Sequence, residues 1–251
     1  MDWGRAKNVL IISFLLLNIL LGYQLWLDIR EQLHVNVNTA ELPQDKILLM
    51  QQKHISLEAN LPLETPKLGD LNYLLQSDSR DNVEPVMLET PVDSKVIYSR
   101  SELKKTLGSR IPDLDQYVFD LKNSSVDVFS LNRVVDGHPM FDVKLELSIS
   151  NQKITAFQQD RIELLGIGEE KQVLPAVKVV GSLIETYLPD GAVITDIQLG
   201  YHGQIFDSEK QVAAPSWRVL LENAPPFYVH AISGEVSTDE VKAETAANGL
   251  H

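Results

Sequence analysis

The chain contains no cysteine among its 251 residues. This absence excludes disulfide bonds, thiolate zinc sites, catalysis by a thiol and lipid attachment through a lipobox cysteine. Hydrophobic residues make up 44% of the chain, with 12 prolines and 13 glycines, which is typical of a globular protein and not of a disordered one. The length allows one or two domains.

Basic residues are scarce as well. Lysine and arginine together number 22, against 35 aspartates and glutamates, so the formal net charge is −13. Nucleic-acid binding depends on basic side chains that neutralise phosphates, and a surface this acidic repels the phosphate backbone. We therefore expect no nucleic-acid partner.

Recognisable catalytic and cofactor motifs are missing. No two of the six histidines lie three to five residues apart, so there is no local zinc-binding pair. Gly166-Ile167-Gly168 lacks the third glycine of a dinucleotide-binding loop, and no G-x-S-x-G elbow occurs. Acidic pairs such as Glu169-Glu170 are most simply solvated loop charges. We expect no enzymatic activity, no cofactor and no metal site, although carboxylates distant in the sequence could still converge in space.

One long hydrophobic run is present. Residues 9–27 carry no charged side chain, and a helix of this length spans about 28 Å, close to the hydrocarbon thickness of a bilayer. Arg5 and Lys7 precede the run, and a basic flank stays in the cytoplasm. We expect a cytoplasmic N-terminus (1–8), a transmembrane helix (9–27), a linker (28–42) and an extracytoplasmic remainder, in a single-pass protein of the cell membrane.

A cleaved signal peptide is the main alternative to this anchor. Its hydrophobic region is usually about 7–15 residues long and is followed by small residues at the cleavage site. Here the run is longer, and its exit from Gly22 to Asp28 is bulky and lacks an A-x-A pattern. Tyr23 and Trp26 also suit the outer interfacial belt of a membrane, so an uncleaved anchor is favoured. A buried soluble helix fits less well still, because no polar residues mark a solvent face.

Polar and small residues interrupt the run at Ser13, Asn18 and Gly22. Asn18 and Gly22 are four residues apart and share one face of a helix. An amide inside a bilayer needs a hydrogen-bond partner, and a glycine lets another helix approach closely. We hypothesise that Ser13, Asn18 and Gly22 contact a partner helix; the alternative is that Asn18 is tolerated alone at a modest cost.

Beyond the linker the patterns indicate an α+β fold with antiparallel sheets. The turn Asp136-Gly137 joins two strands at 126–135 and 140–150, of which the second alternates apolar and polar residues without a miss. Residues 173–188 have helical periodicity and precede strands at 193–201, 217–221 and 227–232. Residues 193, 195, 197, 199 and 201 are expected on one face of the first of these strands. We expect outer subdomains at 43–120 and 121–237 and a loose tail at 238–251.

The first 26 residues resemble a known family. The opening Met1-Asp-Trp-Gly-Arg-Ala-Lys7 and the segment Asn18-Ile-Leu-Leu-Gly-Tyr-Gln-Leu-Trp26 are similar to the amino terminus of the YycI (WalI) family. The resemblance implies an extracytoplasmic α+β domain, a regulatory partner of related fold (YycH-type), and a membrane complex with a WalK-type sensor histidine kinase. It also implies control of cell-wall metabolism in low-GC Gram-positive bacteria. The family has no catalytic residues to place on this chain.

The C-terminal part, subdomain 121–237, also resembles a PepSY-like arrangement, in which a helix is followed by three antiparallel strands. The segments that carry this resemblance are Trp217-Arg-Val219 and Val229-His-Ala-Ile-Ser-Gly-Glu-Val236. Two alternatives to a kinase regulator remain open. One is a PepSY-type inhibitor or ligand-binding module that acts on an envelope protease. The other is a cell-wall hydrolase whose carboxylates lie far apart in the sequence.

Overall fold

The computed structural model describes residues 14–15, 18, 42–76, 84–203 and 208–238. Within these residues no helix has the length and apolar character needed to cross a membrane. The expected transmembrane helix at 9–27 lies outside the described residues except for Phe14, Leu15 and Asn18. The expected linker and the expected tail lie outside them too, apart from Leu42 and Thr238.

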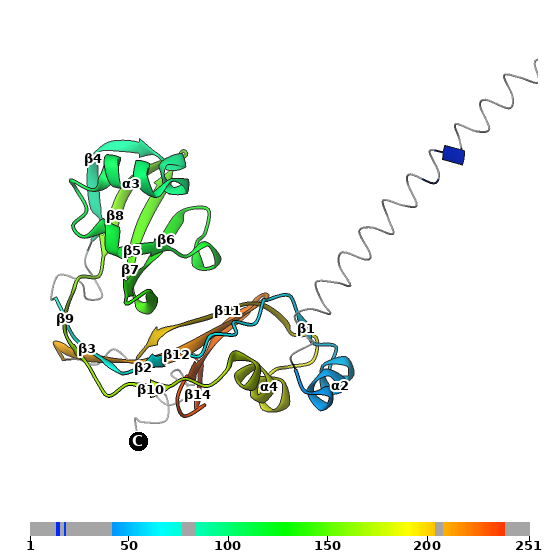
Figure 1. Cartoon of the computed structure of the whole chain (residues 1–251). Helices are drawn as coiled ribbons and strands as arrows, with labels where there is room; N and C mark the ends of the chain where they lie inside the picture. Colours follow the sequence, from blue (N-terminus) through cyan, green and yellow to red (C-terminus); the bar gives the residue numbers. More distant parts are fainter. Residues whose placement is uncertain (1–13, 16–17, 19–41, 77–83, 204–207, 239–251) are drawn as a thin grey trace, which may run out of the picture.

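The described chain forms two lobes, each around its own hydrophobic core. We call residues 84–160 the insert lobe, and residues 42–76 with 161–238 the base lobe. From residue 42 the described chain runs through part of the base lobe, crosses the insert lobe, and returns to the base lobe (Figure 1). The subdomain boundary expected between residues 120 and 121 falls inside the insert lobe, between two strands that pair with each other.

The insert lobe is an antiparallel sheet covered by short helices. Its strands, in spatial order, are β5 (Tyr117–Phe119), β6 (Val128–Val135), β7 (His138–Ser150), β8 (Lys153–Gln159) and β4 (Val86–Asp93). The helical segments are η2 (Ser94–Tyr98), α3 (Arg100–Leu107), η3 (Leu114–Gln116) and η4 (Leu121–Asn123). Leu107 and Ile111, both fully buried, pack with Leu145, Leu147 and Ile154 of the sheet.

The hairpin expected around Asp136-Gly137 is confirmed. Asp136 and Gly137 have φ values of 48° and 81°, the left-handed region that a tight hairpin turn requires at both positions. On β7, the alternation of buried and partly buried residues from Phe141 to Ser148 follows the sequence pattern. The alternation of buried and partly buried residues along β7 therefore determines which face of the strand packs against the core.

The base lobe combines a sheet with two packed helices. Its main strands are β11 (Val193–His202), β12 (Lys210–Leu221), β13 (Ala224–His230) and β14 (Val236–Thr238), paired antiparallel in this order. The shorter strands are β1 (Ser56–Leu57), β2 (Lys67–Leu68), β3 (Leu71–Leu75), β9 (Ile162–Ile167) and β10 (Lys171–Gln172). Helices α2 (Gln44–Gln52) and α4 (Ala176–Thr186) pack together beside this sheet. The α+β class with mainly antiparallel pairing is confirmed.

Two local expectations are corrected. Ile194, not Val193, is fully buried on β11, because a β-bulge between Ile194 and Asp196 shifts the alternation before Ile197. The expected helix at 173–188 begins later, after Pro175, which precedes the first helical residue Ala176.

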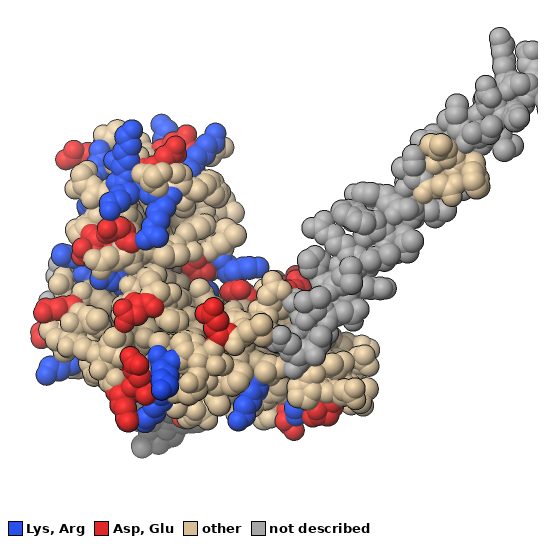
Figure 2. All heavy atoms as spheres, in the orientation of Figure 1, with Lys and Arg blue, Asp and Glu red and all other residues tan. Residues whose placement is uncertain are grey.

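Basic and acidic side chains are interspersed over the face shown in Figure 2, so this face of the described part offers no continuous basic surface.

Candidate functional site at the junction of the lobes

The two lobes meet where β7 lies beside β11. Met140 and Tyr201 pair in parallel register and join the two sheets into one. The approach depends on Gly200, because a Cβ there would lie 2.6 Å from Cζ of Phe141 and closer still to the carbonyl oxygen of Pro139. Since real Cβ atoms essentially never come this close, only glycine permits the contact.

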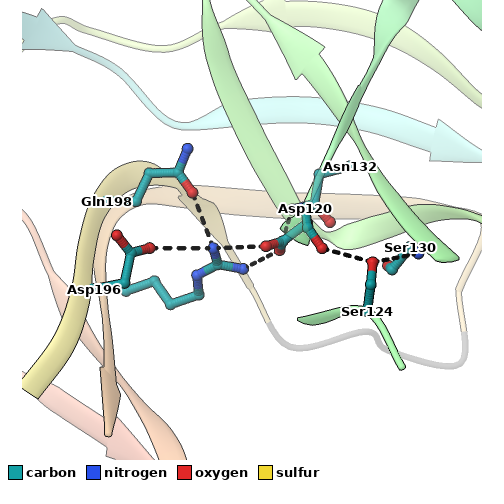
Figure 3. A network of polar contacts seen from close by, with 7 residues as sticks. Asp120, Ser124, Ser130, Asn132, Asp196 and Gln198 are labelled. Carbon is teal, nitrogen blue, oxygen red and sulfur yellow. Dashed lines mark hydrogen bonds and ion pairs between the residues drawn. The ribbon is translucent and has the colours of Figure 1, made fainter. Parts of the chain in front are cut away.

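A buried ion pair bridges this junction (Figure 3). Arg218 on β12 of the base lobe is 3% exposed, and Asp120, just before η4 of the insert lobe, is 7% exposed. The Arg218 Nη1 atom donates to Asp120 Oδ2, and Nη2 donates to Oδ1 at 3.3 Å. This two-point geometry suits the planar guanidinium and fixes the orientation of both side chains.

Further polar groups hold the two members of the pair. Arg218 Nη2 also donates to Gln198 Oε1 at 3.0 Å and lies 3.9 Å from Asp196 Oδ2. Asn132 Nδ2 on β6 donates to Asp120 Oδ2 at 2.9 Å. The hydroxyl of Ser124 donates to the carbonyl oxygen of Asp120 at 2.7 Å. Each lobe therefore holds its own charged side chain with polar groups of that lobe.

The charge state of Asp120 follows from these contacts. Burial raises the pKa of its carboxyl group, but the hydrogen bond and the positive charge of Arg218, with the amide of Asn132, outweigh burial and lower the pKa below its ordinary value. Asp120 is therefore ionised at neutral pH. The pair is a true salt bridge in the interior.

Aromatic rings extend the same network to a second acid. The Arg218 guanidinium carbon lies 4.5 Å from the ring centre of Phe141, whose ring is 5.7 Å from that of Tyr228. Tyr228 stacks on His202 with centroids 3.7 Å apart. The His202 Nδ1 atom lies 2.8 Å from Asp142 Oδ2 on β7. A second contact between an acid of the insert lobe and a side chain of the base lobe thus lies beside the first.

A small open pocket adjoins the ion pair. Its volume is about 180 Å³, and Lys122 of the insert lobe lines it together with Thr195, Arg218 and Tyr228 of the base lobe. The Arg218 Nε atom has no hydrogen-bond partner in the described part of the chain. Pockets for drug-sized ligands occupy about 300–1,000 Å³, so this one suits at most a small polar group.

The junction holds no arrangement recognisable as catalytic. Across the described ranges, no three His, Cys, Asp or Glu residues cluster as metal ligands would. Ser-x-x-Lys spacings occur at Ser101–Lys104 and Ser150–Lys153, and both serines are exposed. Lys104 Nζ is 3.0 Å from Asp115 Oδ2, and both side chains are largely exposed to solvent. What the junction can do is hold two lobes in one relative orientation.

The residues singled out from the sequence lie elsewhere. Ser13 and Gly22 lie outside the described residues, and Asn18 donates its side-chain Nδ2 to the carbonyl oxygen of Phe14 at 2.8 Å. Asp120 and Arg218 were not expected from the sequence. The available signal was an arginine between Trp217 and Val219 in an apolar strand, which marks a position that needs a buried partner.

The family model described as "YycI protein" matches residues 37–232, which covers both lobes and most of the chain. No curated protein matches. The chain is also similar to the crystal structure of an uncharacterized protein from Eubacterium rectale, at 12% identity over 80% of this chain and 83% of that one, with a TM-score of 0.39. The chain belongs to the YycI family, a non-catalytic family of regulators of the WalK two-component system.

Proposed function

We propose that this protein is a single-pass membrane regulator that modulates a WalK-type sensor histidine kinase together with a YycH-type partner. Membership of the YycI family is the observation that carries the proposal. Residues 9–27 form the transmembrane helix, with residues 1–8 in the cytoplasm and both lobes outside the cell. The helix contacts its partners in the membrane through Ser13, Asn18 and Gly22.

The structure supports a role in binding rather than in chemistry. Its two lobes are joined by a buried ion pair, so the outer part presents a defined shape to another protein. Helix α4 followed by β11, β12 and β13 matches a helix with three antiparallel strands, and this supports the PepSY-like assignment. Regulation then requires that the outer part and the helix bind the two states of the kinase with different free energies.

Co-expression of the full-length chain with the kinase and the YycH-type protein tests the proposal. Membranes are solubilised in mild detergent, the chain is recovered by a tag, and autophosphorylation of the kinase is measured with and without the chain. We expect both partners to be recovered and the autophosphorylation rate to change. Recovery of the chain with neither partner contradicts the proposal, and recovery with a peptidase favours the protease-inhibitor alternative.

Topology needs a separate measurement. A reporter enzyme that is active only outside the cytoplasm is fused after His251, and the same fusion is made to a variant that lacks residues 9–27. We expect activity from the first fusion alone. Absence of activity from the first fusion, or a mature protein that starts after Trp26, contradicts a single uncleaved anchor.

A further inference from the structure

Strand β9 (Ile162–Ile167) lies at an open edge of the base lobe. It pairs antiparallel with β3 on one side, and no described strand pairs with its other side. Figure 1 shows it at the margin of the lobe, where the chain returns from the insert lobe. An edge of this kind offers a row of backbone N–H and C=O groups to another strand.

The side chains of β9 are unusually apolar for their exposure. Leu164 is 43% exposed and Leu165 is 48% exposed. Both leucines therefore expose apolar surface at this edge. Ile167 adds to it at 42% exposed. Leu165 has no cross-strand partner on β3, because a bulge separates the pairs formed by Leu164 and Gly166.

The other described edges of the sheets are shorter than β9 or carry proline. Strand β4 carries Pro91 and an irregular register between Met87 and Val92. The outer strands β5 and β14 have three residues each. Short strands and proline are devices that prevent edge-to-edge association. The six residues of β9 include neither proline nor lysine.

We propose that the outer edge of β9 is an interaction surface at which an extended strand of a partner protein adds to the sheet. Backbone hydrogen bonds would supply affinity, and the exposed side chains of Leu164 and Leu165 would pack against apolar side chains of the incoming strand. The inference rests on the proposed function, because it takes the strand to come from the regulatory partner named there.

Charge indicates what the incoming strand is like. Glu163, Glu169 and Glu170 are exposed along β9 and the turn after it. Among the described residues, the salt bridge at this edge joins Glu169 to Lys171 Nζ, at 3.9 Å. A second copy of this chain would bring another net charge of −13 to the same edge. The edge therefore fits a strand of a different protein in which lysine or arginine alternates with apolar residues.

A substitution on β9 with a matched control on another edge tests the surface. The full-length chain carrying Leu165→Lys is co-expressed with the YycH-type protein and recovered in detergent, beside wild type and Met87→Lys on β4. Both replaced side chains are exposed, at 48% and 71%, so each variant is expected to fold. We expect Leu165→Lys to lower recovery of the partner at least tenfold, and Met87→Lys to leave it unchanged.

Amide hydrogen exchange of the wild-type pair gives a readout that does not depend on any variant. We expect the amides of β9 to gain protection in the complex and those of β4 to stay as they are. A wild-type complex that survives Leu165→Lys without new protection of β9 overturns this surface and leaves the proposed function standing. Absence of a wild-type complex overturns both. A dimer of the chain alone that Leu165→Lys dissociates assigns the edge to a second copy and overturns the partner strand.

Discussion

Asp120 and Arg218 lie 98 positions apart in the sequence and form a bidentate ion pair where the two lobes meet. Both side chains are almost completely buried, at 5% and 4% exposed. Desolvation of two charges is costly, and only the surrounding amide and hydroxyl groups allow the pair to form in the interior. The relative orientation of the lobes therefore depends on a contact that requires both charges.

Removal of one charge should cost more than removal of both. Asp120→Asn leaves the guanidinium of Arg218 buried without its counter-charge, and we expect the free energy of unfolding to fall by about 3–5 kcal/mol. Arg218→Met alone should cost a similar amount. The double variant should lose less than either single variant, because neither charge is left unpaired. Denaturant unfolding of the full chain in detergent, followed by circular dichroism, measures all three; strictly additive losses would contradict coupling.

Acid should weaken the same contact at a defined pH. Burial raises the pKa of Asp120, but the hydrogen bond and charge of Arg218 outweigh it and hold the pKa below its ordinary value of 3.8. A pKa that is lower in the folded state contributes stability above the unfolded value, and this stability is lost as pH falls through the folded value. Unfolding free energies between about pH 3 and pH 6 should therefore fall at the acid end. Asp120→Asn should lack this part of the decrease; identical slopes for both proteins would contradict it.

Gly200 should tolerate no side chain. In Gly200→Ala the new Cβ would lie 2.6 Å from the Phe141 ring and against the Pro139 carbonyl, so β7 and β11 must separate. Overpacking of this kind costs about 1–3 kcal/mol. Gly181→Ala on α4 is the matched control, because its Cβ would come no nearer than 3.6 Å to Lys46 and alanine favours a helix. Thermal unfolding should show a lower midpoint for the first variant and an equal or higher one for the second.

The sequence predicts what is local and misses what is distant. The hairpin at Asp136-Gly137 and the helix after Pro175 are each specified by a few neighbouring residues, and both form. The apolar run Val96-Ile97-Tyr98 favours a strand, but it lies in the 3₁₀ segment η2, because the side chain of Asp93 accepts a hydrogen bond from the amide of Lys95 and starts a helical turn. One such side-chain bond reverses a propensity that the apolar residues alone favour.

The division into lobes could not be predicted for a different reason. The base lobe joins residues on both sides of the insert lobe, so Leu71 and Tyr73 pack with Trp217 and Val219 across a long stretch of chain. Periodicity reports which face of a strand is buried but not against which strand it packs. The contact between Asp120 and Arg218 could not be predicted for the same reason, because the sequence around each residue gives no indication of the other.

The last prediction concerns Asn18, one of the three residues proposed to contact a partner helix. Asn18 donates its Nδ2 atom to the carbonyl of Phe14 in its own helix, and the amide still offers a second N–H and an oxygen to a neighbouring helix. If a partner helix uses them, Asn18→Leu should remove an interaction of about 1–2 kcal/mol, equivalent to a roughly five- to thirtyfold weaker association in the membrane. Recovery of kinase and YycH-type protein from detergent should fall by such a factor, while the unfolding midpoint of the two lobes stays unchanged. Leu15→Ala, three residues away, removes apolar surface without touching the amide and serves as the control. Equal recovery with Asn18→Leu and wild type would mean that the amide is satisfied within its own helix and marks no contact.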